Sequence, residues 1–215
     1  MILYIIMKLN FKEGKGDKIH VLVDGEYYFT VDKAYFAVMG IYQGKEVSRE
    51  ELALLGESAE NRRAYNCAVG YLSRRDHSAK ELLLKLRQKG YAESAEYAVE
   101  KLCSEGYVDD ERFARMYVRE LINIKRYGKR RIEQELYRKG IDREIISSVL
   151  EETDFDENEL CALINRKYLR CLSDEKGIKK TVASLMRKGY SFSEIKSALN
   201  KIAEDEEYNL EVSDE

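Results

Sequence analysis

Basic side chains at a repeated spacing are the residues of this sequence best suited to chemistry on a partner. Three strings of the form Leu-x-x-Lys-Gly, each followed by an aromatic or apolar residue, contain Gly90, Gly140 and Gly189. A basic residue precedes each glycine by ten positions, and a lysine directly precedes it. Lysine and arginine in register favour contact with phosphates or with an acidic protein surface. The candidate partner-binding and DNA-binding residues are Lys80, Lys125, Arg126, Lys129, Arg130, Arg131, Lys179 and Lys180.

The segment from Lys125 to Arg131 holds the densest group of these cations. It surrounds Tyr127 and Gly128, where we expect a helix to begin beside an opening in the backbone. Positive charge at a helix start opposes the macrodipole, so the dipole does not explain the group. Contact with phosphates or an acidic partner is favoured, and a solvated charged face stays open as the alternative. The lysines directly before the three glycines are explained equally well by a helix C-terminus, which cations stabilise.

Catalytic and metal-binding patterns are missing from the sequence. There is no phosphate-binding glycine loop, no Gly-x-Gly-x-x-Gly and no Gly-x-Ser-x-Gly. The four cysteines form no Cys-x-x-Cys pair, and we interpret them as reduced core thiols, typical of a reducing cytoplasm. The acidic triplet Asp109-Asp110-Glu111 is interpreted as a helix cap and first turn rather than a metal site. We therefore predict no enzymatic activity, no cofactor and no metal.

The composition favours helices and concentrates positive charge in the middle of the chain. The 215 residues include no proline, and 36% of them are charged. Straight charged side chains keep most of their rotamer freedom in a helix. Residues 62–150 carry 20 basic and 14 acidic side chains, whereas residues 151–215 carry 10 and 16. A polyanion would therefore bind to the middle, and the acidic end, residues 204–215, is predicted to be a solvated tail.

The three glycines also define the helical repeat that must position the cations. They are 50 and then 49 residues apart, a period typical of tandem modules. Ser78, Gly128 and Gly177 stand twelve residues before them and are acceptable helix starts. We expect a helix before each central helix, at about residues 60–75, 110–126 and 156–172, and one after it, at about 93–105, 143–152 and 192–202. The buried sides of the central helices are predicted to be lined by Leu83, Leu86, Ile132, Leu136, Val182 and Leu185. We predict a mainly α fold with a β-rich unit at residues 1–58, modules at 59–108, 109–154 and 155–203, and the tail.

The first 58 residues contain a small antiparallel β unit. Asp24-Gly25 between β-rich runs predicts a hairpin with a type I′ turn. A short helical stretch follows the third run, and Ser48 with Glu51 forms a capping box that opens another helix. The apolar run from Met1 to Met7 is too short for a membrane span and is expected to begin a strand. The three expected strands are Lys8–Lys12, Ile19–Val23 and Tyr27–Val31.

Several strings in the helical part carry a resemblance to a known family. They run from Tyr71 to Arg75, Ser78 to Tyr91, Leu102 to Ala114, and Gly128 to Gly140. With the third module they cover residues 60–202, and this part of the chain resembles the RecX recombination-regulator family. The stretch from Gly106 to Ala114 is the most specific, and the β unit resembles the extension of longer members.

The resemblance implies an elongated, curved array of three three-helix modules and a partner. Such proteins lie in the groove of the RecA filament on single-stranded DNA and inhibit strand exchange, ATP hydrolysis and coprotease activity. It implies a cytoplasmic, monomeric regulator of homologous recombination, DNA repair and the SOS response, with no membrane contact. At a net charge of −3, we expect DNA binding by the protein alone to be weak and salt-sensitive.

Two other classes of function remain as alternatives. A stand-alone DNA-binding protein of the helical-repeat type would bind duplex DNA tightly without a recombinase, and the negative net charge disfavours it. An enzyme acting on nucleic acid would need an acid, base or metal constellation that the sequence lacks. We expect replacement of Lys129, Arg130 and Arg131 by alanine to weaken inhibition of RecA without loss of helicity.

Overall fold

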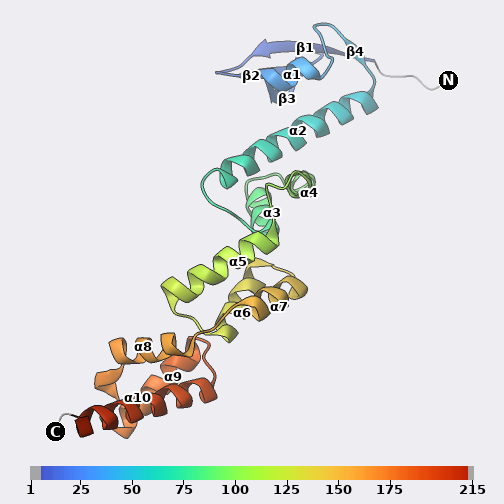
Figure 1. The fold of residues 1–215 in the computed structure, drawn as a ribbon. Helices are drawn as coiled ribbons and strands as arrows, with labels where there is room; N and C mark the ends of the chain where they lie inside the picture. The colour runs from blue at the N-terminus through green and yellow to red at the C-terminus, as the bar shows by residue number, and fades with distance from the viewer. Residues whose placement is uncertain (1–5, 213–215) are drawn as a thin grey trace. The chain divides into compact units, whose positions relative to one another are not determined.

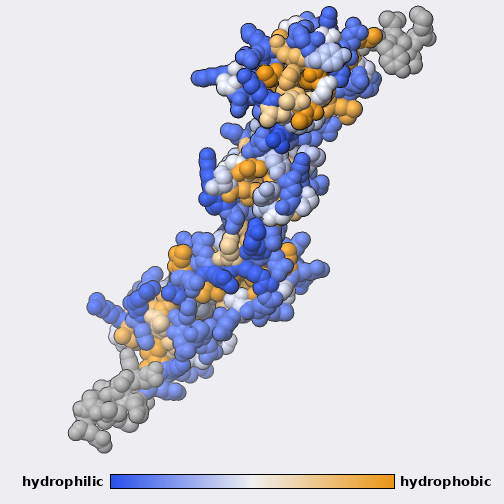
Figure 2. Space-filling view, turned by 45° about the horizontal axis from the view of Figure 1, so that its top comes forward, coloured by the Kyte–Doolittle hydropathy of each residue, from blue (hydrophilic) through white to orange (hydrophobic). Residues whose placement is uncertain are grey.

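The computed structural model describes residues 6–212, with side chains through residue 204. The chain divides between Val108 and Asp109 into two compact units (Figure 1). The first unit contains the β-rich part and one helical module, and the second contains two helical modules. Apolar side chains gather in four separate cores. The face seen in Figure 2 is accordingly mainly hydrophilic.

The first unit opens with a four-stranded antiparallel sheet in the order β3-β2-β1-β4. Asp24 and Gly25 join β2 to β3 with φ angles of 49° and 92°, the left-handed geometry that a type I′ turn requires. The three predicted strands are confirmed, whereas β4 was not predicted because two residues show no alternation. Residues 1–5, where we expected the first strand to begin, lie outside the described part. The strands are β1 (Met7–Glu13), β2 (Lys18–Val23), β3 (Glu26–Asp32) and β4 (Glu46–Val47).

A short helix, α1 (Lys33–Val38), follows the sheet, and the 24-residue helix α2 (Arg49–Leu72) follows β4. The predicted capping box is present, because Ser48 and Glu51 each accept the other's backbone N–H. The sequence predicted a second helix from about residue 60, but α2 runs through without interruption. Its first half packs on the sheet through Leu52, and its second half packs in the first helical module through Ala68.

Each helical module encloses its own apolar core, and leucine and alanine are buried in all three. Leu86, Ile132, Leu136 and Leu185 are fully buried, as predicted. The module helices are α3 (Ala79–Gln88), α4 (Ala95–Ser104), α5 (Asp110–Glu120), α6 (Lys129–Lys139), α7 (Arg143–Glu152), α8 (Glu157–Lys167), α9 (Glu175–Arg187) and α10 (Phe192–Val212). A π-helix, η1 (Leu121–Lys125), extends α5, and a 3₁₀ turn, η2 (Leu169–Cys171), follows α8.

Two predicted helix boundaries in the third module were wrong. Helix α9 begins after Asp174, whose carboxylate accepts the N–H of Gly177 at 2.5 Å, so Gly177 lies inside the helix. Aspartate is the stronger N-cap, and it takes the position three residues earlier. Helix α10 was expected to end near residue 202 and continues to Val212 within the acidic segment. Residues 213–215 of that segment lie outside the described part.

The repeated string Leu-x-x-Lys-Gly is a helix stop anchored in a core. Gly90, Gly140 and Gly189 have φ angles of 99°, 78° and 95°, which side chains disfavour. The residue after each glycine donates its N–H to the carbonyl of the buried leucine five positions earlier, at 3.0–3.3 Å. This is the Schellman arrangement, in which an apolar residue follows the glycine. The repeat in the sequence therefore records one local structure formed three times.

The cysteines only partly follow the prediction of core thiols. All four are thiols outside any disulfide, and Cys67 and Cys161 are half-buried. Cys103 and Cys171 are exposed, which contradicts their assignment to a core. Cys103 follows the fully buried Leu102, and one helical residue turns the side chain by about 100°, away from the core.

Candidate partner interface on the second and third helical modules

An unusual connector links α5 to α6 in the second unit. The chain widens into the π-helix η1 and then reverses at Arg126, whose φ of 53° is rare for a residue with a side chain. The Arg126 guanidinium lies 2.7 Å from a carboxylate oxygen of Glu159. The Tyr190 hydroxyl donates to the carbonyl of Arg126 at 3.4 Å. Side chains of the third module therefore hold the connector, and single π turns of this kind often occur at functional sites.

The start of α6 meets the end of α9 directly. Gly128 donates its N–H to the carbonyl of Lys188 at 2.9 Å, and Arg130 donates to the carbonyl of Gly189 at 3.3 Å. The first N–H groups of a helix and the last carbonyls of another both lack partners within their own helix, and here they satisfy each other. The backbone opening expected beside Gly128 is thus filled by the third module. We call this contact the junction, formed by residues 128–131 and 188–190.

Close backbone approach at the junction depends on its two glycines. A Cβ atom on Gly128 would lie 2.7 Å from the carbonyl carbon and oxygen of Gly189. A Cβ atom on Gly189 would lie 2.3 Å from the backbone nitrogen of Arg131. Neither separation is possible without movement of the backbone. The glycines therefore have a packing role in addition to starting and stopping helices.

Lys188 is part of the junction rather than of an open surface. Its Nζ donates to the carbonyl of Lys125 at 2.8 Å and lies 5.3 Å from the centre of the Tyr127 ring. Burial lowers the pKa of this lysine below its ordinary value. Lys188 is one of the three lysines that precede the repeated glycines, and its contacts favour a structural role over partner binding.

The eight predicted site residues fall into paired and unpaired cations. Arg131 lies 2.7 Å from Glu135, and Lys179 lies 2.5 Å from Glu175, while Arg126 pairs with Glu159 as described. The other five are exposed and make no ion pair with any described residue. These five are Lys80, Lys125, Lys129, Arg130 and Lys180.

The structure brings five of the eight residues together around the junction. Lys125, Lys129 and Arg130 are its unpaired members, and we call them the free cation group. Lys179 and Lys180 lie near the start of α9, about 13 Å along that helix from its junction end at ~1.5 Å per residue. Lys80 lies in the first unit, on α3. The basic residues that recur at the same spacing in the sequence therefore do not form one continuous cluster within the second unit.

Acidic residues beside the free cation group escaped the sequence prediction. A small cavity of about 40 Å³ lies next to Lys129 and Phe155, with Lys129 Nζ 5.9 Å from the Phe155 ring centre. Its lining includes the carboxylates Asp156, Glu157, Glu159 and Glu194. They belong to another module, so their spacing along the sequence gave no signal. The surface beside Lys129 is therefore of mixed charge.

The residues that the structure describes contain neither a metal-binding cluster nor a helix suited to cross a membrane. Residues 6–204 contain no group of three or more histidine, cysteine, aspartate or glutamate side chains arranged to hold a metal ion. Asp109 caps α5 as predicted, accepting the N–H of Arg112 at 2.9 Å. No helix among the described residues has the length and apolar character needed to cross a membrane.

The fold and the junction define an α-helical repeat protein of three-helix modules. Three family models match, describing the first, second and third three-helix domains of RecX, at residues 64–102, 109–150 and 156–199. The chain belongs to the RecX family of regulatory proteins.

Similar proteins and solved structures agree with this membership. "Regulatory protein RecX" of Caldanaerobacter subterraneus subsp. tengcongensis is 35% identical over 190 residues, covering 88% of this chain and 95% of the relative. That of Clostridioides difficile is 30% identical, covering 96% and 99%. A crystal structure of regulatory protein RecX has a TM-score of 0.67 at 23% identity, covering 90% and 99%. The crystal structure of RecX from Lactobacillus salivarius has a TM-score of 0.61 at 26% identity, covering 68% and 98%.

Proposed function

We propose that this chain is a cytoplasmic, non-catalytic regulator that binds the RecA recombinase filament on single-stranded DNA. Binding lowers the recombinase, ATPase and coprotease activities of the filament. Membership of a family of regulatory proteins supports a role of this kind. The observation that carries the choice of surface is the free cation group, because Lys125, Lys129 and Arg130 are exposed and lack ion-pair partners among the described residues.

The junction suits a binding surface because it fixes these cations on a rigid backbone. Arg130 is anchored through its own N–H to Gly189, and the carbonyl of Lys125 accepts from Lys188. Less backbone freedom is then lost on binding. The neighbouring carboxylates favour a protein surface of opposite sign, while the three cations face phosphates. Neutralising three phosphates of a single strand gives a salt dependence of about −2 in the logarithmic slope.

The test measures the single-stranded-DNA-dependent ATPase rate of RecA during titration with substoichiometric amounts of this protein in moderate salt. We expect the full chain to lower the rate. The triple variant Lys125→Ala, Lys129→Ala, Arg130→Ala should inhibit several-fold less at the same concentration. Lys125 takes the place of Arg131 in this variant because Arg131 pairs with Glu135 and packs on Gly189.

A matched control variant distinguishes loss of the free cation group from loss of positive net charge. Arg166, Arg170 and Lys196 are exposed on the second unit, and their replacement by alanine removes the same charge. This control should inhibit like the unmodified chain, and circular dichroism should show equal helicity in all three proteins. An ATPase rate unaffected by the unmodified chain would contradict the proposed function. Equal loss of inhibition in both triple variants would contradict the assignment of the surface.

A further inference from the structure

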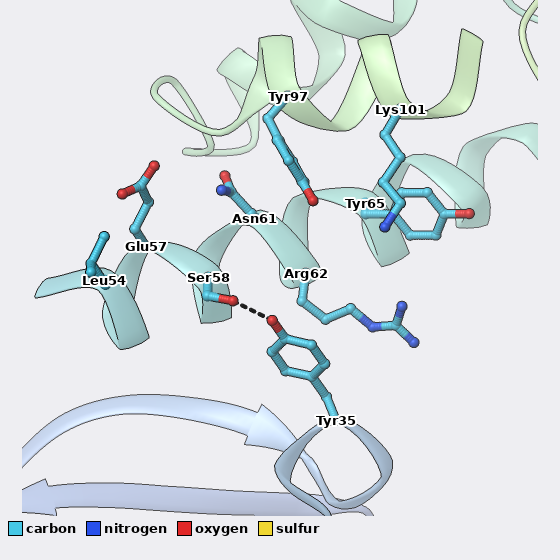
Figure 3. Close-up of a pocket in the computed structure, with 9 residues that line it drawn as sticks. All are labelled: Tyr35, Leu54, Glu57, Ser58, Asn61, Arg62, Tyr65, Tyr97 and Lys101. Atoms are coloured by element: carbon cyan, nitrogen blue, oxygen red, sulfur yellow. Dashed lines mark hydrogen bonds between the residues drawn. The ribbon is translucent and has the colours of Figure 1, made fainter. Parts of the chain in front are cut away.

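A cavity in the first unit is lined by aromatic and cationic side chains that none of the preceding roles uses. It has a volume of about 280 Å³ and lies between α1, α2 and α4 (Figure 3). Three tyrosines, Tyr35, Tyr65 and Tyr97, line it with Arg62 and Lys101. Its volume is just below the range of typical ligand sites, which is about 300–1,000 Å³. The cavity therefore fits a small planar group rather than a large ligand.

Two of the tyrosines hold the cations in place through their rings. The Arg62 guanidinium carbon lies 5.6 Å from the centre of the Tyr35 ring and 5.8 Å from that of Tyr65. Lys101 Nζ lies 5.3 Å from the centre of the Tyr65 ring. The hydroxyls of these tyrosines are occupied elsewhere, because Tyr35 is hydrogen bonded to Ser58 and Tyr65 donates to Glu105 at 2.5 Å. The rings are thus fixed platforms that orient positive charge.

The two cations keep unused hydrogen-bonding capacity. Arg62 Nε is shielded from solvent, has no hydrogen-bond partner among the described residues, and lies 3.9 Å from a carboxylate oxygen of Asp32. Lys101 has no carboxylate within ion-pairing distance in the described part of the chain. Glu57 lines the cavity too, at the end away from Arg62 and Lys101 (Figure 3). The Arg62 end therefore favours an anionic group.

Tyr97 adds an exposed aromatic ring to the cavity, and this ring belongs to none of the hydrophobic cores. It extends from α4 toward the cavity, beside Asn61 of α2 (Figure 3). Its side chain is 46% exposed. An exposed aromatic ring beside cations is the combination that binds single-stranded nucleic acid, because bases stack on the ring and phosphates contact the cations.

We propose that this cavity binds one nucleotide of single-stranded nucleic acid, with the base stacked on Tyr97 and the phosphate near Arg62 and Lys101. The proposal does not depend on the partner proposed above, because it rests on a separate unit and on a separate set of residues. It gives the β-rich part of the chain a function, because α1 contributes Tyr35 to the platform beneath Arg62.

The test measures binding of a fluorescein-labelled oligothymidylate to the full chain by anisotropy. All proteins carry the triple replacement of the free cation group, which removes that surface from the measurement. Tyr97→Ala should weaken binding about tenfold, since stacking on an aromatic side chain contributes ~1–3 kcal/mol per base. Lys101→Ala should reduce the logarithmic salt slope by about 0.7, and Lys101→Arg should restore it. Tyr42→Ala, which removes another exposed tyrosine of this unit, should leave the affinity unchanged.

Photocrosslinking with 5-iodouracil in the same oligonucleotide locates the contact. Crosslinks at Tyr97 or Tyr65 would support the proposal. Crosslinks found only outside the cavity, no measurable binding by the background protein, or an affinity unchanged by Tyr97→Ala would each overturn it. Equal helicity of the variants excludes unfolding as the cause. The RecA ATPase assay with the unmodified chain is a separate result, so either proposal can fail alone.

Discussion

Replacement of Gly189 by alanine tests whether direct backbone contact holds the second and third modules together. Gly189 stops α9 with a φ of 95°, and its added Cβ would lie 2.3 Å from the Arg131 nitrogen. Gly90 provides a matched control, because it stops α3 with a φ of 99° and an added Cβ there meets nothing within 4 Å. Both substitutions force a residue with a side chain into the left-handed conformation, but only Gly189→Ala also disturbs a backbone contact.

The magnitude follows from these two terms. A left-handed conformation costs a residue with a side chain roughly 1–2 kcal/mol, which applies to both variants. Gly189→Ala also separates the modules and weakens the hydrogen bonds from Gly128 and Arg130, each contributing about 1 kcal/mol net. We therefore expect Gly189→Ala to destabilise the second unit by about 2 kcal/mol more than Gly90→Ala destabilises the first. For a unit of roughly 100 residues, 1 kcal/mol corresponds to about 4 °C, so the extra fall in melting temperature is about 8 °C.

Two assays report this difference. Thermal unfolding followed by circular dichroism gives the melting temperatures of the two variants. Hydrogen exchange reports the local effect. The exchange rates of the Gly128 and Arg130 amides should rise more than tenfold in Gly189→Ala and should stay the same in Gly90→Ala. Gly128→Ala is a second variant with an ordinary φ of −81°, so it perturbs the contact without left-handed strain. Similar losses for Gly189→Ala and Gly90→Ala, with protection of both amides retained, would refute the reasoning.

Two further predictions concern a buried histidine and a buried leucine. Burial lowers the pKa of His77 below its ordinary value of 6.5, although a carboxylate oxygen of Glu81 lies 3.3 Å away. The unfolded chain therefore takes up the proton more readily, so the His77 contribution is complete above pH 6.5 and is lost as the pH falls below it. Melting temperatures between pH 7.5 and 5 should fall less steeply in His77→Gln, and identical slopes would contradict this assignment. Leu136→Ala in the second module should lower the free energy of unfolding in urea by about 2–5 kcal/mol. Leu84→Ala, at a side chain that is 47% exposed, should lower it by less than about 0.5 kcal/mol. Equal losses would contradict the placement of the core.

Local features of the structure were predictable because their causes lie within a few residues. The hairpin at Asp24-Gly25 and the capping box at Ser48 each depend on one turn of chain. The repeated stop at Gly90 and its counterparts needs only a glycine, an apolar neighbour and a leucine five positions before that neighbour. The same reasoning failed at Asp174 and Gly177, where two possible helix starts competed. It also failed in α2, which is one continuous helix where two were predicted.

Burial was predictable for the face of a helix and less so for single residues. Leu83 and Val182 were expected in the cores and are half-buried, whereas their neighbours Leu82 and Thr181 are almost fully buried. One position corresponds to a rotation of about 100°, so a small difference in helix orientation exchanges neighbouring residues at the edge of the buried stripe. The orientation is set by the partner helices, which the sequence pattern of one helix does not contain.

The sequence by itself determined most of the helices and strands, the threefold repeat and the place where cations gather. Only the tertiary structure decided which of those cations are available. Gly128 and Gly189 are 61 residues apart, and each looks like an ordinary helix boundary in the sequence. Their backbone contact, the carboxylates opposite Lys129 and the ion pair from Arg126 to Glu159 join different modules. Contacts of this kind depend on the folded positions of two surfaces, and spacing along the chain does not encode those positions locally.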